Sequence, residues 1–311
     1  MSYISVNDLK TQYKTQTGIV HAVDGVSFFL EKGESIGIAG ESACGKSTLG
    51  LSLMRALQGG IVVSGDILLD GKSIIKMSES EFTKNYRWKE ISMVFQGAMN
   101  SLDPVFTVEH QFHEILKQHN YTGDFDKRIA EIITSVGLNN SVLKKFPHEL
   151  SGGMKQRIVI AMALLLNPKF VIADEPTTAL DVLVQAQVIS LLKKLKKEGL
   201  SIMLITHDLA IISEIAEKIG VMYGGKMIEF GSSSEIYKDP KHPYTQGLLQ
   251  SIPSLKENKK PQYIRGNPPT LLNPPQGCRF YDRCPHAMEK CKKDPPKIKT
   301  DSGYVQCWLY E

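Results

Sequence analysis

The chain has 311 residues, of which 42% are hydrophobic and 23% charged, and its formal net charge is +4. That length allows one large domain with an appendage or two modest domains, and the small net charge gives no reason to expect a nucleic-acid partner. The longest apolar run, Ile158 to Leu166, is about half a transmembrane span, and the N-terminus lacks the pattern of a secretion signal, so we expect a cytoplasmic protein.

The first 95 residues are expected to form strands and turns around a phosphate-binding loop. Apolar positions from Val20 to Phe28 fit short strands, and residues 33–39 fit a strand that feeds Gly40. The next eight residues match G-x-x-x-x-G-K-S, a glycine-rich turn that points backbone N–H groups at phosphate oxygens. A helix over residues 47–57 should follow, with its positive end toward the nucleotide. The predicted phosphate-site residues are Gly40, Glu41, Ser42, Ala43, Cys44, Gly45, Lys46, Ser47 and Thr48.

The middle of the chain is expected to be helical and then to carry a second anion-binding motif. Helices are predicted over residues 109–119 and 126–136. The segment Leu150 to Arg157 then places Ser151, Gly152 and Gly153 ahead of another helix, and a helix N-terminus of this kind favours an anion. Taken alone, the motif could equally be a helix cap followed by a turn.

Residues 151–232 alternate between helix and strand patterns, which predicts a parallel sheet with crossover helices. The apolar run from Phe170 ends in Asp174 and Glu175, a pattern that suggests a Mg²⁺-shell carboxylate followed by one beside the attacking water. A lysine-rich run at residues 193–197 fits the solvated face of a helix that ends at Gly199. The strand from Ile202 ends at His207, near where a γ-phosphate would lie in such a sheet.

The last eighty residues change in character. Residues 252–275 are rich in proline and lysine and fit an extended linker. Four of the five cysteines follow, in a segment too small to bury a core of its own, namely Cys278, Cys284, Cys291 and Cys307. In a cytoplasmic protein such clustering favours metal over disulfides, and the residues alone leave zinc, an iron–sulfur cluster or four reduced thiols open.

The three central motifs, with Gln96 between the first two and His207 after the third, resemble the ATP-binding-cassette family. The resemblance implies an α/β fold, a P-loop cassette ATPase with a mixed sheet core. It places the ATP-binding core at residues 1–96 and 151–250 and a helical subdomain that touches the membrane partner at 97–150. An irregular, cysteine-rich C-terminal extension, including the linker, would cover 251–311.

The resemblance also implies roles for individual residues. ATP would bind between two such subunits, with Lys46 and His207 on the γ-phosphate from one side and the Ser151 motif from the other. Glu175 would polarise the attacking water, and Gln96 would sense the γ-phosphate. Ser47, Gln96 and Asp174 would bind Mg²⁺. Tyr13 would stack on adenine, although it could instead be a partly buried strand tyrosine. Asp181 would contact the other subunit.

The tail resembles that of D-type ATPase subunits of oligopeptide/dipeptide importers, of the peptide/opine/nickel class. The resemblance rests on His242-Pro243-Tyr244-Thr245 and on the context of the four cysteines. Some members of that group carry a 4Fe–4S cluster, so the resemblance implies such a site on the four cysteines here. The site would be structural or redox-sensing, because it lies far in sequence from the phosphate loop. Implied partners are a second ATP-binding subunit (sister chain or self), two transmembrane permease subunits and a solute-binding protein, with this chain peripheral on the cytoplasmic face of the membrane.

The sequence leaves the transported solute open, and other classes of nucleotide-binding protein have to be weighed. After Gln96 the peptide-transporter pattern runs acidic residue then proline, whereas this chain has Gly97-Ala98, so the solute could be an oligosaccharide or nickel instead of a peptide. A cassette protein that acts on nucleic acid or ribosomes is the other candidate, but such proteins usually carry two cassettes or a coiled arm, and this sequence has neither. An isolated kinase or GTPase is not favoured either, because such a protein would lack the Ser151 motif that this chain carries.

Overall fold

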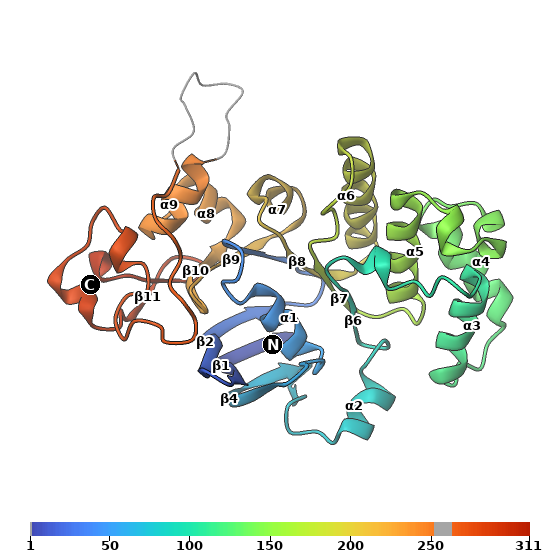
Figure 1. The fold of residues 1–311 in the computed structure, drawn as a ribbon, viewed down its shortest axis with the longest axis horizontal. Coiled ribbons are helices and arrows are strands. Elements are labelled where there is room, and N and C mark those ends of the chain that lie inside the picture. The colour runs from blue at the N-terminus through green and yellow to red at the C-terminus, as the bar shows by residue number, and fades with distance from the viewer. Residues whose placement is uncertain (1, 252–262) are drawn as a thin grey trace. The chain divides into compact units, whose positions relative to one another are not determined.

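A computed structural model of the chain describes residues 2–251 and 263–311 (Figure 1). These residues divide into two compact units. The first unit contains the described residues up to Ile75 and from Ile205 onward, and the second is Lys76–Leu204. The compact units divide the chain after Ile75 and after Leu204, and the predicted functional regions divide it after residues 96, 150 and 250. The two divisions therefore differ, and the boundaries of the functional regions stay a prediction.

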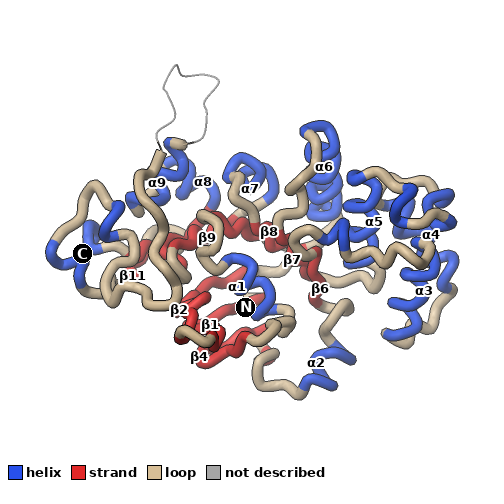
Figure 2. Tube along the Cα trace, in the orientation of Figure 1, coloured by secondary structure: helices blue, strands red, loops and turns tan. Residues whose placement is uncertain are grey.

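The first unit contains an antiparallel sheet with the strand order β2-β1-β4-β5 (Figure 2). Its strands are β1 (Ile4–Thr15), β2 (Gly18–Leu30), β4 (Gly60–Leu69) and β5 (Lys72–Ser73). The apolar positions from Val20 to Phe28 belong to one long strand instead of several short ones, because β2 pairs with β1 along its whole length and tolerates register shifts.

A second set of strands in this unit has the order β11-β12-β10-β9-β3. The apolar strand β3 is fully buried and pairs in parallel with β9, while the other pairs are antiparallel. Phe28 of β2 and Phe230 of β10 join the two sheets, with ring centroids 6.4 Å apart. The remaining elements are β3 (Ile36–Ala39), α1 (Lys46–Leu53), α7 (Leu209–Ile215), β9 (Lys218–Tyr223), β10 (Lys226–Ser232), α8 (Ser233–Lys238), α9 (Pro243–Gln250), β11 (Lys297–Lys299) and β12 (Tyr304–Gln306).

The second unit combines helices with the strands β6 and β7, which pair in parallel with Val94 opposite Ala173. Helices α3 and α4 begin and end one residue before the predicted bounds. They begin there because Thr107 and Asp124 cap their N-termini. Helix α6 ends at Lys197, just before Gly199, as predicted. The elements are α2 (Glu79–Asn85), β6 (Ile91–Val94), α3 (Val108–Gln118), α4 (Phe125–Ser135), α5 (Gly152–Leu164), β7 (Phe170–Asp174), α6 (Val182–Lys197) and β8 (Ser201–Ile205), whose last residue begins the second part of the first unit.

The cysteine-rich extension is integrated into the first unit. Its β12 strand pairs with β10, and Phe280 is 2% exposed. Part of the predicted linker, residues 252–262, lies outside the described residues; beyond it, the segment runs beside β2, where the N–H of His21 donates to the Leu271 carbonyl. The short tail therefore buries its apolar side chains against the larger unit, because it is too small for a core of its own.

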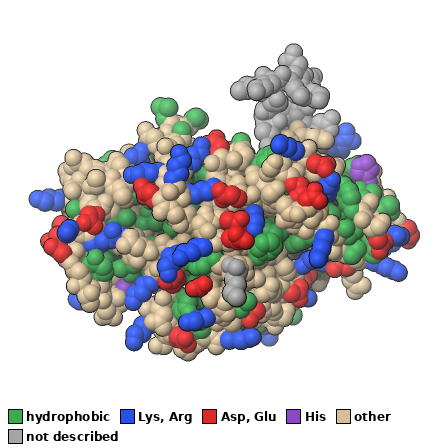
Figure 3. Space-filling view, turned by 180° about the vertical axis from the view of Figure 1, so that it is seen from behind, with side chains coloured by type: hydrophobic (Ala, Val, Ile, Leu, Met, Phe, Trp, Pro, Cys, Tyr) green, Lys and Arg blue, Asp and Glu red, His purple; other side chains and the backbone are tan. Residues whose placement is uncertain are grey.

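The surface seen in Figure 3 intersperses Lys and Arg with Asp and Glu side chains. Within residues 2–251 and 263–311, no helix has the length and apolar character needed to cross a bilayer.

Candidate nucleotide-binding site

The phosphate loop connects β3 to α1, and two of its glycines are required by close backbone approach. Gly40 has a φ of 150°, and a Cβ there would lie 2.2 Å from the Met222 carbonyl oxygen. Gly45 has a φ of 103°, and its Cβ would lie 2.0 Å from the Ala22 carbonyl oxygen. Because neither separation leaves room for a side chain, only glycine allows the loop to pack against these two strands.

Lys46 is buried at the start of α1 and turns back over the loop. Its Nζ donates to the carbonyl oxygens of Gly40 at 2.8 Å and Glu41 at 2.9 Å. The ammonium group is thus held within the loop, where the sequence predicts it should meet a phosphate. Cys44 is also buried, and burial raises the pKa of its thiol even though Lys46 opposes the shift.

Tyr13 and His207 belong to the same unit as the loop. Tyr13 is half-buried on β1, and its ring covers Gly60, where a Cβ would lie 2.6 Å from the ring. This packing is the one expected of a partly buried strand tyrosine; adenine stacking stays a prediction. His207 is exposed directly after Thr206, whose N–H donates to the carbonyl of Ile38 in the strand that feeds the loop.

Two residues outside the predicted phosphate site hold the loop. The Tyr244 hydroxyl accepts the N–H of Glu41 at 2.9 Å, and Arg283 donates to both Glu41 carboxylate oxygens at 2.8 and 2.9 Å. The cysteine site is expected to be structural or redox-sensing because it lies far in sequence from the phosphate loop, and that role stays a prediction. Folding nevertheless brings Arg283, next to Cys284, onto the loop. Both residues belong to motifs by which the tail resembles importer ATPase subunits, but nothing in those motifs indicates that the two residues contact Glu41.

The second unit brings Gln96 and Glu175 together. Parallel pairing of β6 with β7 places the ends of both strands at one edge, where the Gln96 amide donates to the Glu175 carboxylate at 3.1 Å. The Thr178 hydroxyl donates to the same oxygen at 2.9 Å. Asp174, at the end of β7, is 2% exposed, and Glu175 has a φ of 46°, an uncommon conformation for a residue with a side chain.

Ser151 and Asp181 cap neighbouring helices in the second unit. The Ser151 hydroxyl accepts the N–H of Met154 at the start of α5, and the Asp181 carboxylate accepts that of Val184 at the start of α6. Gly153 lets the helices approach, since its Cβ would lie 2.6 Å from a Val184 methyl. Gly152 and Ser151 are exposed, so this helix N-terminus is open to a ligand.

Comparison with known proteins identifies the family. The profile described as ABC transporter matches residues 23–178. The dipeptide transport ATP-binding protein DppD of Caldanaerobacter subterraneus subsp. tengcongensis is 44% identical over 317 residues, covering 99% of this chain and 97% of that protein. This chain belongs to the ABC transporter family. It is an ABC transporter ATPase, whose ATP hydrolysis is coupled to transport.

A second profile, the oligopeptide/dipeptide transporter C-terminal region, matches residues 228–291 of this ABC transporter chain. The oligopeptide transport ATP-binding protein OppD of Escherichia coli (strain K12) is 43% identical, covering 97% of this chain and 91% of that protein. Among solved structures, the ADP- and Pi-bound dimer of the cassette MJ0796 has a TM-score of 0.66 at 28% identity, covering 74% of this chain and 98% of that one. CbiO1 of Clostridium perfringens has a TM-score of 0.64 at 29% identity, covering 76% and 91%. The predicted cassette fold is confirmed.

Proposed function

We propose that this chain is the ATP-hydrolysing subunit of an importer for dipeptides or oligopeptides. The observation that carries the proposal is the match of residues 228–291 to the oligopeptide/dipeptide transporter C-terminal region, on a chain whose relatives named for dipeptide or oligopeptide transport align along nearly its full length. Import of this kind requires that the subunit bind and hydrolyse ATP and that it act on a permease.

ATP would bind between two such subunits. The loop N–H groups and Lys46 would hold the phosphates, His207 would contact the γ-phosphate, and Tyr13 would stack on adenine. The second subunit would supply the helix N-terminus at Ser151, Gly152 and Gly153, while Asp181 would contact the opposite chain. Since each site would be completed by the other chain, a lone subunit should be nearly inactive.

Hydrolysis would depend on Glu175 as the group that polarises the attacking water. The amide of Gln96 and the hydroxyl of Thr178 both donate to its carboxylate, which supports a fixed orientation for this base. Mg²⁺, when bound, would neutralise phosphate charge, and its ligands would be Ser47, Gln96 and Asp174, all oxygen donors that suit this ion.

Exposed apolar side chains in the second unit support protein partners. Phe95, Val105 and Phe106 are 44%, 69% and 42% exposed, and a protein contact would remove apolar side chains of this kind from water. We assign these three side chains to the contact with the permease pair. Val182 and Leu183, next to Asp181, are 80% and 77% exposed and would contact the second cassette. The chain would thus act as a peripheral subunit on the cytoplasmic face, supplied with solute by a separate binding protein.

The four tail cysteines would hold a 4Fe–4S cluster, with a zinc ion or free thiols as the alternatives. All four lie within the first unit and none forms a disulfide, and the N–H of Cys278 donates to the Cys291 carbonyl at 2.8 Å. Burial, and then the neighbouring thiols, raise the pKa of Cys278 to about 12. In the described part of the chain no three His, Cys, Asp or Glu side chains form a group that could hold a metal ion, so the proposal rests on the chemistry of the four thiols and not on their arrangement. A four-iron cluster takes one thiolate per iron, which suits this donor set, and the positive irons would offset the high pKa.

Transport by the assembled complex tests the main proposal. The chain should be reconstituted in vesicles with its second cassette, the two permease subunits and the binding protein, and uptake of labelled peptide, oligosaccharide and Ni²⁺ compared. We expect ATP-dependent uptake of peptide. Uptake of oligosaccharide or Ni²⁺ without peptide would contradict the proposed solute but not the ATPase.

Glu175→Gln tests the hydrolytic role in the same complex. We expect ATP binding to persist and turnover to fall about 10²- to 10⁴-fold, since only the proposed base is lost. Glu198→Gln, on the surface after α6, is the matched control and should turn over at the parent rate. Near-parent hydrolysis by Glu175→Gln would show that the base lies elsewhere.

Metal analysis of anaerobically purified protein tests the tail. We expect about four irons per chain, reduced by serine at any of the four tail cysteines but not by Cys44→Ser, which alters the phosphate loop. One zinc per chain without iron or sulfide would replace the cluster with a zinc site, and metal-free protein would leave four thiols.

A further inference from the structure

The cysteine-bearing tail is joined to the phosphate loop by a bidentate ion pair. Arg283, directly before Cys284, donates to both carboxylate oxygens of Glu41 at 2.8 and 2.9 Å. The Arg283 side chain is 7% exposed and that of Glu41 26%. Water and salt therefore screen the pair only weakly, and the parallel fork geometry belongs to the strongest class of charge-assisted hydrogen bond.

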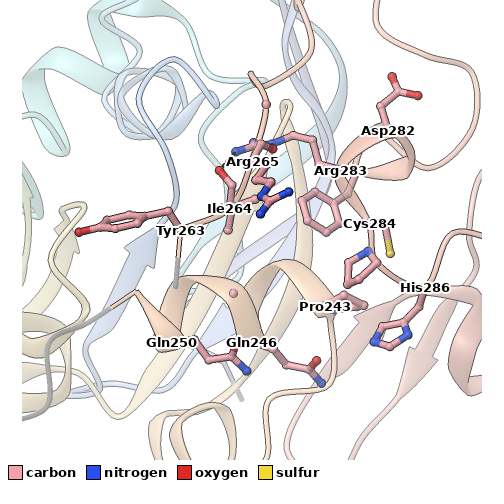
Figure 4. Close-up of a pocket in the computed structure, with 14 residues that line it drawn as sticks. Pro243, Gln246, Gln250, Tyr263, Ile264, Arg265, Asp282, Arg283, Cys284 and His286 are labelled. Atoms are coloured by element: carbon pink, nitrogen blue, oxygen red, sulfur yellow. Dashed lines mark hydrogen bonds between the residues drawn. The ribbon is translucent and has the colours of Figure 1, made fainter. Parts of the chain in front are cut away.

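Further hydrogen bonds fix the guanidinium in this position. Its Nη1 donates to the Tyr223 hydroxyl at 3.1 Å, and its Nε donates to the Arg265 carbonyl at 2.9 Å. The guanidinium is always charged in proteins, so the pair with Glu41 joins two opposite charges. Arg265 and Arg283 line a cavity of about 630 Å³. Figure 4 shows both side chains across from α9, which carries Gln246 and Gln250.

Glu41 is held from a second direction by α9. Its N–H donates to the hydroxyl of Tyr244, which is fully buried. The Tyr244 N–H donates to His242 at 3.0 Å, and the His242 N–H donates to the Glu229 carboxylate on β10 at 3.0 Å. The backbone and the side chain of Glu41 are thus both tied to the C-terminal part of the first unit.

The position of Glu41 affects Lys46, because Lys46 Nζ donates to the Glu41 carbonyl at 2.9 Å. We propose that Arg283 is a positioning residue for the phosphate loop, and that through Glu41 it couples order in the cysteine-bearing segment 278–291 to ATP affinity. The coupling rests on ATP binding at this loop, as the proposed function requires, but on neither the solute nor a bound cluster. Linkage makes it reciprocal, so ATP should stabilise the tail as much as the tail favours ATP.

Binding of the fluorescent analogue mant-ATP to the full chain tests the proposal. We expect Arg283→Met and Glu41→Gln each to raise the Kd about tenfold, because fewer molecules hold the loop in its binding geometry. The double variant should be no weaker than either single one. Arg283→Lys, which keeps the charge without the fork, should fall between parent and Arg283→Met.

Lys290→Met is the matched control, since Lys290 is a tail cation that pairs with Glu311 at the surface, 2.9 Å away. It should bind mant-ATP like the parent. The proposal is overturned if Arg283→Met binds as tightly as Lys290→Met, or if the effects of Arg283→Met and Glu41→Gln multiply in the double variant. A parent chain that fails to bind mant-ATP would instead refute the nucleotide site itself.

Hydrogen–deuterium exchange gives a test whose deciding outcome comes from the unmutated chain, so it does not depend on whether variants fold. The nonhydrolysable analogue AMP-PNP should slow exchange across residues 278–291 in the parent and in Lys290→Met, and the slowing should disappear in Arg283→Met. Unchanged exchange in the parent at saturating nucleotide would overturn the coupling.

Discussion

Alanine at Gly45 should abolish tight ATP binding. Gly71→Ala is the control that separates the effect of a steric clash from the effect of backbone strain. Both glycines have positive φ, 103° and 75°, so alanine costs about 1–2 kcal/mol of backbone strain at either position. Gly71 lies in the turn between β4 and β5, where a Cβ would meet nothing within 4 Å among the described residues beyond its chain neighbours. At Gly45 the new carbon would lie 2.0 Å from a backbone carbonyl oxygen. The difference between the variants therefore measures the close approach and not the strain.

The clash sets the size of the effect. Real Cβ contacts are essentially never shorter than 3.0 Å, so the loop at Gly45 must move by at least about 1 Å. A shift of that size takes an N–H···O distance of about 2.9 Å beyond the range of a hydrogen bond. Losing two hydrogen bonds to charged phosphate oxygens, each contributing about 1.5–3 kcal/mol, would weaken binding at least about a hundredfold.

Titration with mant-ATP and Mg²⁺ measures the affinity of both variants, and thermal unfolding measures their stability. Gly71→Ala should lose only stability and should bind like the parent. If Gly45→Ala binds within about threefold of Gly71→Ala, the loop has room that the structure does not show, and the argument from backbone approach fails.

Three further outcomes are expected. Ser151→Arg should leave mant-ATP binding to the single chain intact and abolish hydrolysis by the assembled transporter; an active variant would exclude sites shared between subunits. Gly153→Ala should lower the melting temperature because its new carbon meets a Val184 methyl at 2.6 Å, and adding Val184→Ala should restore it; no recovery would place the strain elsewhere. Burial lowers the pKa of His242 to about 3, so the folded chain binds fewer protons than the unfolded one below pH of about 6.5. Stability should therefore be fully present above that pH and fall as pH drops toward 3, by up to about 1.4 kcal/mol per pH unit, and His242→Asn should flatten the melting-temperature profile between pH 7 and 4.

The local chemistry of the site could be predicted from sequence because each motif is formed by consecutive residues. The phosphate loop needs Gly40 and Gly45 where the backbone turns, and the two carboxylates at the end of β7 follow from an apolar run that ends there. Helices α3 and α4 could be predicted to within one residue because their capping residues and apolar spacing are local features.

Only the tertiary structure decided which distant residues hold the loop. Tyr244 and Arg283 lie 203 and 242 positions from Glu41 along the chain, and no local pattern relates them. The pairing of β12 with β10 anchors the tail, and the burial of Phe280 beside Tyr223 and Tyr244 turns the segment before Cys284 toward the loop. Periodicity and motif spacing indicate which surfaces a segment must bury, but they do not indicate which other segment covers those surfaces. The hydrophobic effect is non-directional, so the covering segment depends on how the whole unit packs.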